Sequence, residues 1–185
     1  MNYIKDVFNT VCGYLGLYTK KANLLFLGLD DAGKSTLLYM LKTDKMTQLK
    51  PTIQPHSEEL KLGNIRFNTF DLGGHETARK IWKDYFPSVD GIIFLVDSSN
   101  SKRFPEAKEE LENLANTPEL LNIPICILGN KVDKENAVNE EELKEALDLT
   151  TIMLKESRPM QLFMCSVSKK IGYGNALNWM TNYLK

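Results

Sequence analysis

Residues 28–35 read Gly28-Leu29-Asp30-Asp31-Ala32-Gly33-Lys34-Ser35, and they match the pattern GxxxxGK[ST]. The motif follows an apolar run at 24–27 and opens a helical pattern at 34–42, which is the context that a phosphate loop requires. Its glycines allow backbone N–H groups to converge on phosphate oxygens, and the helix N-terminus adds a partial positive charge. We therefore expect a nucleoside triphosphate site rather than a simple glycine-rich turn.

The residue types within the motif predict separate roles. We expect Lys34 to reach the β- and γ-phosphates and the Ser35 hydroxyl to ligate Mg²⁺. A carboxylate at Asp30 would repel phosphate unless it turned toward the metal or into solvent, so Asp30 is included as a second candidate metal ligand. The predicted phosphate-binding set is Asp30, Asp31, Ala32, Gly33, Lys34, Ser35 and Thr36.

Apolar runs of strand length alternate with helical patterns along the chain. The runs lie at 24–27, 91–96, 123–128 and 160–164, and the helical patterns lie at 34–42, 103–116, 139–147 and 175–184. Continuous apolar runs are typical of parallel strands that helices cover on both faces. One segment alternates instead, around Gly63-Asn64, and predicts a hairpin with a two-residue turn. The expected fold is α/β, with a six-stranded, mostly parallel sheet, one antiparallel edge strand and helices on both faces.

Length and composition limit the classes of function. The chain has 185 residues, of which 43% are hydrophobic and 25% are charged, so it fits one globular domain. A formal net charge of −1 argues against a nucleic-acid binder with a broad basic surface. Cys12, Cys126 and Cys165 show no pairing pattern, and the last two lie in apolar runs, as buried reduced thiols would. This cysteine usage favours the cytosol.

A second motif, Asn130-Lys131-Val132-Asp133, predicts which base the site accepts. A carboxylate at Asp133 can accept hydrogen bonds from both the N1–H and the 2-amino group of guanine. Adenine offers no such pair of donors on that edge. Asn130 can bridge the base and the phosphate loop, and the Lys131 stem can lie over the ring. The alternative interpretation is an ordinary polar loop after a strand.

The loop after the last strand is a further candidate for contact with the base. We expect the backbone N–H of Ser166 to reach the guanine O6 atom, with Val167 and Ser168 beside it. Three residues are a weak signal by themselves, and an ordinary loop is the alternative.

The metal ion and the attacking water require further residues. Asp71 ends the second hairpin strand and can hold a Mg²⁺-bound water, while Gly74 can bring its N–H close to the γ-phosphate. The hydroxyl of Thr52 can reach Mg²⁺ when GTP is bound. His75 is the candidate catalytic residue, because a mostly neutral imidazole there can orient the water. The alternatives are a strand-end turn, a loop threonine and a solvated histidine at a helix start.

The first residues of the chain form an amphipathic pattern. An i, i+3, i+4, i+7, i+11 spacing places on one helix face Ile4, Val7, Phe8, Val11 and Leu15. Lys20 and Lys21 can meet anionic head groups, although the helix could instead pack on the domain. No stretch approaches the ~20 apolar residues that span a bilayer, and no signal peptide is evident. We therefore expect the chain on the cytosolic side of the membrane.

Together these motifs resemble the Arf/Sar branch of the Ras-like GTPases, and closely its Sar type, over essentially the whole chain. The most specific stretches are Asp71-Leu72-Gly73-Gly74-His75-Glu76, Pro51-Thr52-Ile53-Gln54-Pro55, Arg158-Pro159, Phe163-Met164-Cys165-Ser166-Val167 and Gly172-Tyr173-Gly174. His75 fits the Sar type, whereas Arf-type relatives usually carry glutamine there. Residue 2 is Asn rather than the Gly that N-myristoylation requires, which also favours the Sar type. Between Leu149 and Arg158 the chain is shorter than Sar proteins usually are.

The resemblance implies a Ras-like fold that binds GTP and GDP with Mg²⁺ and hydrolyses GTP slowly without a GAP. It implies a membrane-binding segment at 1–21, a GTPase domain at 22–185, and recruitment of the COPII coat for ER-to-Golgi transport. The implied partners are the ER membrane, a membrane-bound exchange factor and the inner COPII coat. The GAP subunit of that coat would supply an arginine, since only Arg79 of this chain's arginines lies near the switch residues.

The implied location is the cytoplasm, with cycling onto the ER membrane and COPII vesicles and with the Golgi membrane as a further site. Three alternatives remain open. They are an Arf-type GTPase at another membrane, a non-hydrolysing guanine-nucleotide scaffold, and a phosphate-loop kinase of small metabolites.

Overall fold

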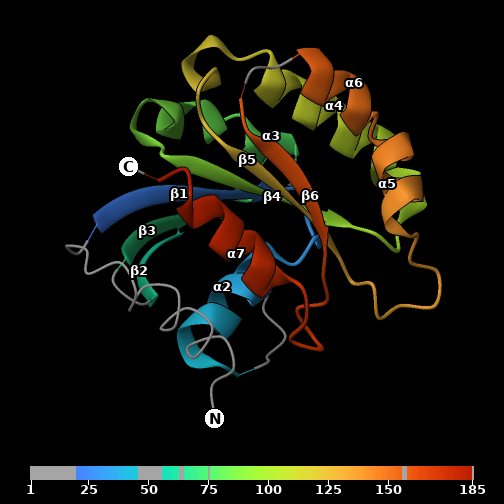
Figure 1. The fold of residues 1–185 in the computed structure, drawn as a ribbon, viewed down its shortest axis with the longest axis horizontal. Helices are drawn as coiled ribbons and strands as arrows, with labels where there is room; N and C mark the ends of the chain where they lie inside the picture. Colours follow the sequence, from blue (N-terminus) through green and yellow to red (C-terminus); the bar gives the residue numbers. More distant parts are fainter. Residues whose placement is uncertain (1–19, 46–55, 63–64, 75, 156–157, 185) are drawn as a thin grey trace.

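The computed structural model describes residues 20–45, 56–62, 65–74, 76–155 and 158–184. In this part of the chain six strands form one sheet in the order β2-β3-β1-β4-β5-β6 (Figure 1). The strands are β1 (Lys20–Gly28), β2 (His56–Leu62), β3 (Ile65–Asp71), β4 (Gly91–Asp97), β5 (Ile125–Asn130) and β6 (Met160–Met164). The edge strand β2 is antiparallel to β3, and the other neighbouring strands are parallel. The predicted six-stranded sheet with one antiparallel edge strand is confirmed.

Helices cover both faces of the sheet (Figure 1). They are α2 (Lys34–Thr43), α3 (Glu76–Arg79), α4 (Phe104–Ala115), α5 (Glu140–Ala146), α6 (Leu149–Lys155) and α7 (Tyr173–Thr181). Short 3₁₀ segments are η1 (Trp82–Ser88), η2 (Ser101–Arg103) and η3 (Pro118–Leu120). Side chains of α2 and α7 join the core on one face, and those of α4, α5 and α6 join the core on the other. The predicted α/β architecture is therefore confirmed.

The two cores explain why the strands are apolar without alternation. Successive residues of β1 point to opposite faces, so Leu25 and Leu27 join one core while Leu24 and Phe26 join the other. All six residues of β5 are buried, as a strand covered on both sides requires. Fully burying one large apolar side chain contributes about 1.5–3 kcal/mol, so these central strands account for much of the stability.

Several element boundaries differ from the sequence prediction. β5 begins at Ile125 rather than at 123, because Pro124 has no N–H to donate to a neighbouring strand. α7 begins at Tyr173 rather than at 175, directly after Gly172 with its positive φ of 85°. β1 begins at Lys20, so the two lysines that we assigned to the N-terminal segment are the first residues of the sheet.

The helix α6 was missing from the prediction. It follows α5 after two intervening residues and buries Leu149 and Ile152 against the core. Seven residues give too short a pattern for the 3.6-residue period to stand out in the sequence. It lies within 149–158, the region in which we expect a shorter chain than is usual in the family that the motifs resemble.

The carboxyl ends of the central strands meet at one edge of the sheet. β1 ends at Gly28, β3 at Asp71, β4 at Asp97 and β5 at Asn130. β1 lies between β3 and β4, so the connection after β1 leads to one side of this strand and the connection after β3 leads to the other. Ligands of open α/β sheets bind outside the carboxyl ends of the strands at such a switch point. The motif at 28–35 starts there.

Some predicted features lie outside the described residues. These are the proposed membrane-facing residues Ile4, Val7, Phe8, Val11 and Leu15, the candidate metal ligand Thr52 and the candidate catalytic residue His75. Among the helices that the structure describes, none is long and apolar enough to cross a bilayer. Cys126 and Cys165 are free and buried, as predicted.

Candidate nucleotide-binding site

The phosphate loop is anchored where it enters α2. Gly33 precedes the helix with a φ of 101°, which favours glycine strongly. A Cβ atom at Gly33 would lie 2.4 Å from the side-chain amide nitrogen of Asn130. A larger residue would therefore also displace the loop at 130–133, the candidate base-binding loop. The sequence therefore requires glycine here for two independent reasons.

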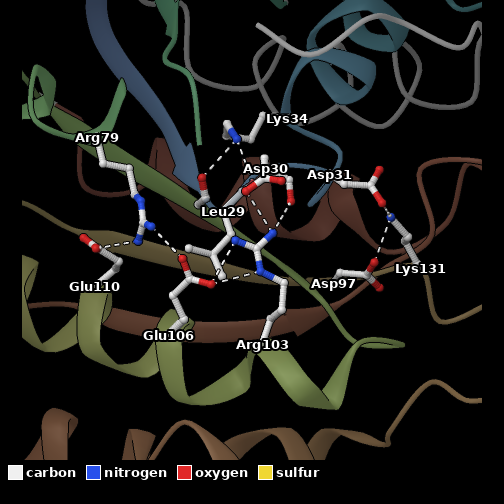
Figure 2. A network of polar contacts seen from close by, with 11 residues as sticks. Leu29, Asp30, Asp31, Lys34, Arg79, Asp97, Arg103, Glu106, Glu110 and Lys131 are labelled. Carbon is white, nitrogen blue, oxygen red and sulfur yellow. Dashed lines mark hydrogen bonds and ion pairs between the residues drawn. The ribbon is translucent and has the colours of Figure 1, made fainter. Parts of the chain in front are cut away.

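Lys34 is almost fully buried at the start of α2. Its Nζ atom donates to the carbonyl oxygens of Gly28 at 3.0 Å and Leu29 at 2.9 Å (Figure 2). Burial lowers the pKa of Lys34 to about 8, and the nearby charges of Asp71 and Asp30 offset this only in part. Because this pKa lies close to neutral pH, the negative charge of a bound phosphate would strongly stabilise the protonated form of Lys34.

Ser35 and Asp71 form the candidate metal site. The Ser35 hydroxyl donates to Oδ2 of Asp71 at 2.5 Å, and Asp71 is 4% exposed at the end of β3. Among the described residues no group of three or more His, Cys, Asp and Glu side chains could hold a metal by itself. One carboxylate and one hydroxyl suit Mg²⁺, which takes few protein ligands and completes its shell with water and nucleotide phosphates. The residues present therefore fit Mg²⁺ at this place.

Asp30 faces a different partner from the one we expected. Its Oδ1 atom lies 2.9 Å from Nη1 of Arg103, which also donates to the Asp30 backbone oxygen at 3.2 Å. Partial burial raises the pKa of Asp30, but the hydrogen bond and charge of Arg103 outweigh it and leave the pKa below its ordinary value. The structure thus holds this carboxylate against Arg103, the last residue of η2, directly before α4.

Gly74 lies directly against the phosphate loop. A Cβ atom there would lie 2.2 Å from the backbone nitrogen of Asp30 and 2.6 Å from the carbonyl oxygen of Gly28. Only glycine permits this approach of the segment after β3 to the loop. His75 follows Gly74 directly and lies outside the described residues, and α3 begins with the next residue, Glu76.

Asn130 ties the base-binding loop to the phosphate loop. Its Nδ2 donates to the carbonyl oxygen of Ala32 at 2.9 Å, and its Oδ1 accepts from the N–H of Val167 at 3.1 Å. Its own carbonyl oxygen accepts bonds from the backbone N–H of Ser98 at 2.8 Å and from the Ser98 hydroxyl at 2.6 Å. The phosphate loop, the loop after β4 and the loop after β6 therefore meet at one buried residue.

Asp133 is held by the loop after β6. Ser166 donates to its Oδ1 at 2.5 Å and Ser168 to its Oδ2 at 2.9 Å. The Ser166 hydrogen bond is the main reason why the pKa of Asp133 lies below its ordinary value. The carboxylate is therefore ionised at neutral pH, and each oxygen retains a lone pair for a donor on the base.

Lys131 joins the base-binding loop to two other carboxylates. Its Nζ atom lies 2.8 Å from Asp97 and 3.1 Å from Asp31 of the phosphate loop (Figure 2). Partial burial lowers the pKa of Lys131, but the bonds to Asp97 and Asp31 outweigh it and leave the pKa above its ordinary value. The stem of this lysine is thereby fixed between the phosphate loop and the end of β4.

Several site residues were not predicted from the sequence. Asp97 ends β4 and Ser98 follows it, and their position at the carboxyl end of a parallel strand was a usable signal. The contacts of Arg103 with Asp30 join residues far apart in sequence, and no motif indicates them.

The comparisons with known proteins agree with this arrangement. The profile of the ADP-ribosylation factor family matches residues 8–184. The small COPII coat GTPase SAR1 of Giardia intestinalis is 44% identical, and the match covers 97% of this chain and 98% of that protein. The protein of the same description from Nicotiana tabacum is 39% identical, with 99% and 100% covered. ADP-ribosylation factor-like protein 5 of Caenorhabditis elegans is 38% identical, with 89% and 92% covered.

A solved structure extends the similarity to the fold. The Arl6 BBS3 small GTPase from Trypanosoma brucei, with the bound nucleotide analogue GppNp, superposes with a TM-score of 0.81. It is 28% identical, and the match covers 88% of this chain and 96% of that chain. The resemblance inferred from the motifs is confirmed: the chain belongs to the ADP-ribosylation factor family, as a small GTPase of Ras-like fold that binds guanine nucleotide and hydrolyses GTP.

Proposed function

We propose that this GTPase is a Sar-type switch, which in its GTP form docks on the ER membrane and recruits the COPII coat for ER-to-Golgi transport. The observation that carries the proposal is the identity of 44% and 39% to proteins described as small COPII coat GTPase SAR1. The match covers nearly the whole of both chains, so it includes the surfaces that partners would contact as well as the nucleotide site.

The nucleotide contacts follow from the two anchored loops. Asp133 accepts from the guanine N1–H and 2-amino group, the stem of Lys131 lies over the ring, and Ser166, Val167 and Ser168 lie beside the base. The Ser166 N–H that we expected on O6 donates instead to the carbonyl oxygen of Ile171 at 3.0 Å. The phosphates bind at residues 30–36, with the Lys34 ammonium on the β- and γ-phosphates. The Asn130 side chain supports this assignment, because its bonds to Ala32 and Val167 keep the phosphate loop and the loop after β6 at a fixed separation.

Mg²⁺ supplies charge stabilisation for the phosphates in this proposal. Ser35 would ligate it through its hydroxyl, Asp71 would hold it through a water, and Thr52 would reach it in the GTP state. The short bond between Ser35 and Asp71 supports a shared role, since both oxygens lie at one point beside the phosphate loop.

Catalysis in this proposal depends on His75 and on an arginine from a GAP. His75 orients the attacking water; in the sequence it follows Gly74, which lies against the phosphate loop. Each arginine of the chain is engaged elsewhere. Arg66 pairs with Glu59, Arg79 with Glu106 and Glu110, and Arg103 with Asp30 and Glu106, while Arg158 donates to the carbonyl oxygen of Ala115. Hydrolysis alone should be on the order of 10⁻⁴ s⁻¹, and an external arginine can add up to ~10⁵-fold.

The membrane role rests on the first 21 residues. The stripe of Ile4, Val7, Phe8, Val11 and Leu15 shelters on the domain with GDP, and a shift of the β2–β3 hairpin releases it with GTP. Insertion without an acyl chain is weak and reversible, as a cycling switch needs. The partners are a membrane-bound exchange factor and the inner COPII coat with its GAP subunit, on the cytosolic face of the ER, on COPII vesicles and at the Golgi membrane.

Flotation with liposomes tests the membrane role. GTP-loaded protein should float with anionic liposomes much more than GDP-loaded protein, and deletion of residues 1–18 should abolish flotation while GDP binding persists. Addition of purified inner COPII coat should then give GTP-dependent coat binding. Equal flotation with both nucleotides would contradict the switch. GTP-dependent flotation without coat binding would favour the alternative of an Arf-type GTPase at another membrane.

A hydrolysis measurement tests the remaining alternative, a non-hydrolysing scaffold. Wild-type protein should convert bound GTP slowly in a single turnover, and the coat GAP should accelerate it. His75→Gly should retain GTP affinity but respond barely to the GAP, because no group orients the water. If stimulated hydrolysis of this variant stayed within about threefold of wild type, the role assigned to His75 would be wrong.

A further inference from the structure

A row of alternating charges connects the phosphate loop to α3 across the first turns of α4 (Figure 2). Its members, in order, are Asp30, Arg103, Glu106, Arg79 and Glu110. Asp30 belongs to the phosphate loop, and Arg79 is the last residue of α3, the helix that begins directly after His75. Opposite charges follow each other at every step.

Glu106 is the residue that joins the two halves of the row. Its Oε2 accepts from Arg103 Nε at 3.0 Å and lies 2.9 Å from Arg103 Nη2. Its other oxygen, Oε1, accepts from Arg79 Nη2 at 2.6 Å. One carboxylate therefore holds one arginine with each oxygen, and each arginine leads to a different part of the site.

The second anchor of Arg79 involves Glu110 alone. Glu110 accepts from Arg79 Nη1 at 2.6 Å and stands one helical turn after Glu106 on the same face of α4. The Arg79 side chain is only 10% exposed, and its Nε atom has no hydrogen-bond partner in the described structure. A buried guanidinium depends on its carboxylates for compensation, and ion pairs in such networks contribute more than isolated surface pairs.

The two glutamates therefore differ in what they can control. Within the described residues Glu110 reaches α3, whereas Glu106 reaches α3 and, through Arg103, both the carboxylate and the backbone oxygen of Asp30. We propose that Glu106 is a positioning residue that couples the phosphate loop to the segment behind His75, so that nucleotide retention and GTP hydrolysis depend on one carboxylate. The inference rests on the proposed roles of residues 30–36 and of His75.

Three glutamine variants on α4 test the proposal at constant side-chain size. Glu106→Gln should raise the dissociation rate of N-methylanthraniloyl-GDP and lower single-turnover GTP hydrolysis, each by about threefold to tenfold. Glu110→Gln should lower hydrolysis alone, because its only partner in the row is Arg79. Glu109→Gln, at an exposed position between them, should leave both rates unchanged.

A double-mutant cycle tests the coupling itself. Asp30→Asn and Glu110→Gln alter the two ends of the row, which share no direct contact. The proposal predicts that their effects on single-turnover GTP hydrolysis are non-additive in the wild-type background and become additive in the Glu106→Gln background, where the connection is lost. Thermal unfolding of every variant with saturating GDP shows whether the rates were measured on folded protein.

The outcomes separate the two levels of the argument. Wild-type protein that neither binds the fluorescent GDP nor hydrolyses GTP would overturn the proposed function. A functional wild type with Glu106→Gln indistinguishable from Glu109→Gln would overturn the positioning role alone. Equal changes of both rates in Glu106→Gln and Glu110→Gln, in proportion to a lowered Tm, would leave the row as a plain stabilising contact and would also overturn it.

Discussion

Replacement of Asn130 by alanine should loosen the whole nucleotide site, because this side chain joins the phosphate loop to the loop after β6. Asn130 is 3% exposed, and its amide makes the bonds to Ala32 and Val167 at 2.9 and 3.1 Å. Alanine leaves a buried carbonyl and a buried N–H without these partners. Each buried unsatisfied group costs about 1–3 kcal/mol, so the two together predict a loss of about 2–6 kcal/mol.

Water can enter part of the space that the amide leaves and can satisfy one of the two groups. We therefore expect the lower half of the range, about 2–4 kcal/mol, in the free energy of unfolding. GDP dissociation should also accelerate by at least about tenfold, which corresponds to 1.4 kcal/mol of the same loss.

Urea unfolding of the GDP-bound protein, followed by circular dichroism, measures the first quantity, and release of a fluorescent GDP measures the second. Asn113→Ala is the matched control, since it removes the same atoms at an exposed position of α4. If Asn130→Ala unfolded within about 0.5 kcal/mol of this control and released GDP at the same rate, Asn130 would not connect the loops as argued.

Three further predictions concern the base, the metal and the phosphates. Asp133→Asn should lose GTP affinity and gain xanthosine triphosphate affinity in competition binding, because the new amide can donate to the xanthine O2; equal losses for both nucleotides would exclude base reading. Ser35→Asn should weaken GTP more than GDP in titrations with Mg²⁺, and an unchanged ratio of the two affinities would remove Ser35 from the metal site. Burial lowers the pKa of free Lys34 to about 8, and bound phosphates raise it, so the bound state holds the proton more tightly. GDP affinity should therefore be constant below the free pKa and fall by up to about tenfold per pH unit as the pH rises above it, and a flat profile would contradict the contact.

The fold could be predicted because its causes are local. The continuous apolar run at 91–96 required a strand covered on both faces, and the alternation around Gly63-Asn64 required a hairpin. Errors arose where the local signal was weak or interrupted. The proline at 124 shortened a strand, and the seven residues of α6 gave too few turns for a clear period.

In the candidate site too, the sequence indicated some residues and missed others. The motifs indicated Lys34, Asp71 and Asn130 because each occupies a fixed distance from a strand end, and the structure places all three at the same sheet edge. The partner of Asp30 was not predictable, because the side-chain contact with Arg103 depends on how α4 packs across the loop. Sequence spacing therefore identified the groups that the structure gathers at this edge of the sheet but not the side chains that hold them in place.

The central claim is that this site selects guanine nucleotides. Competition of GTP and ATP against a bound fluorescent GDP in the presence of Mg²⁺ tests it most directly. A site built to pair with the guanine edge rejects a base that lacks those donors by a factor of about 10⁴–10⁵, so GTP should compete at least about 10³-fold better than ATP. Equal competition by the two nucleotides, or by ATP within about tenfold of GTP, would contradict the account.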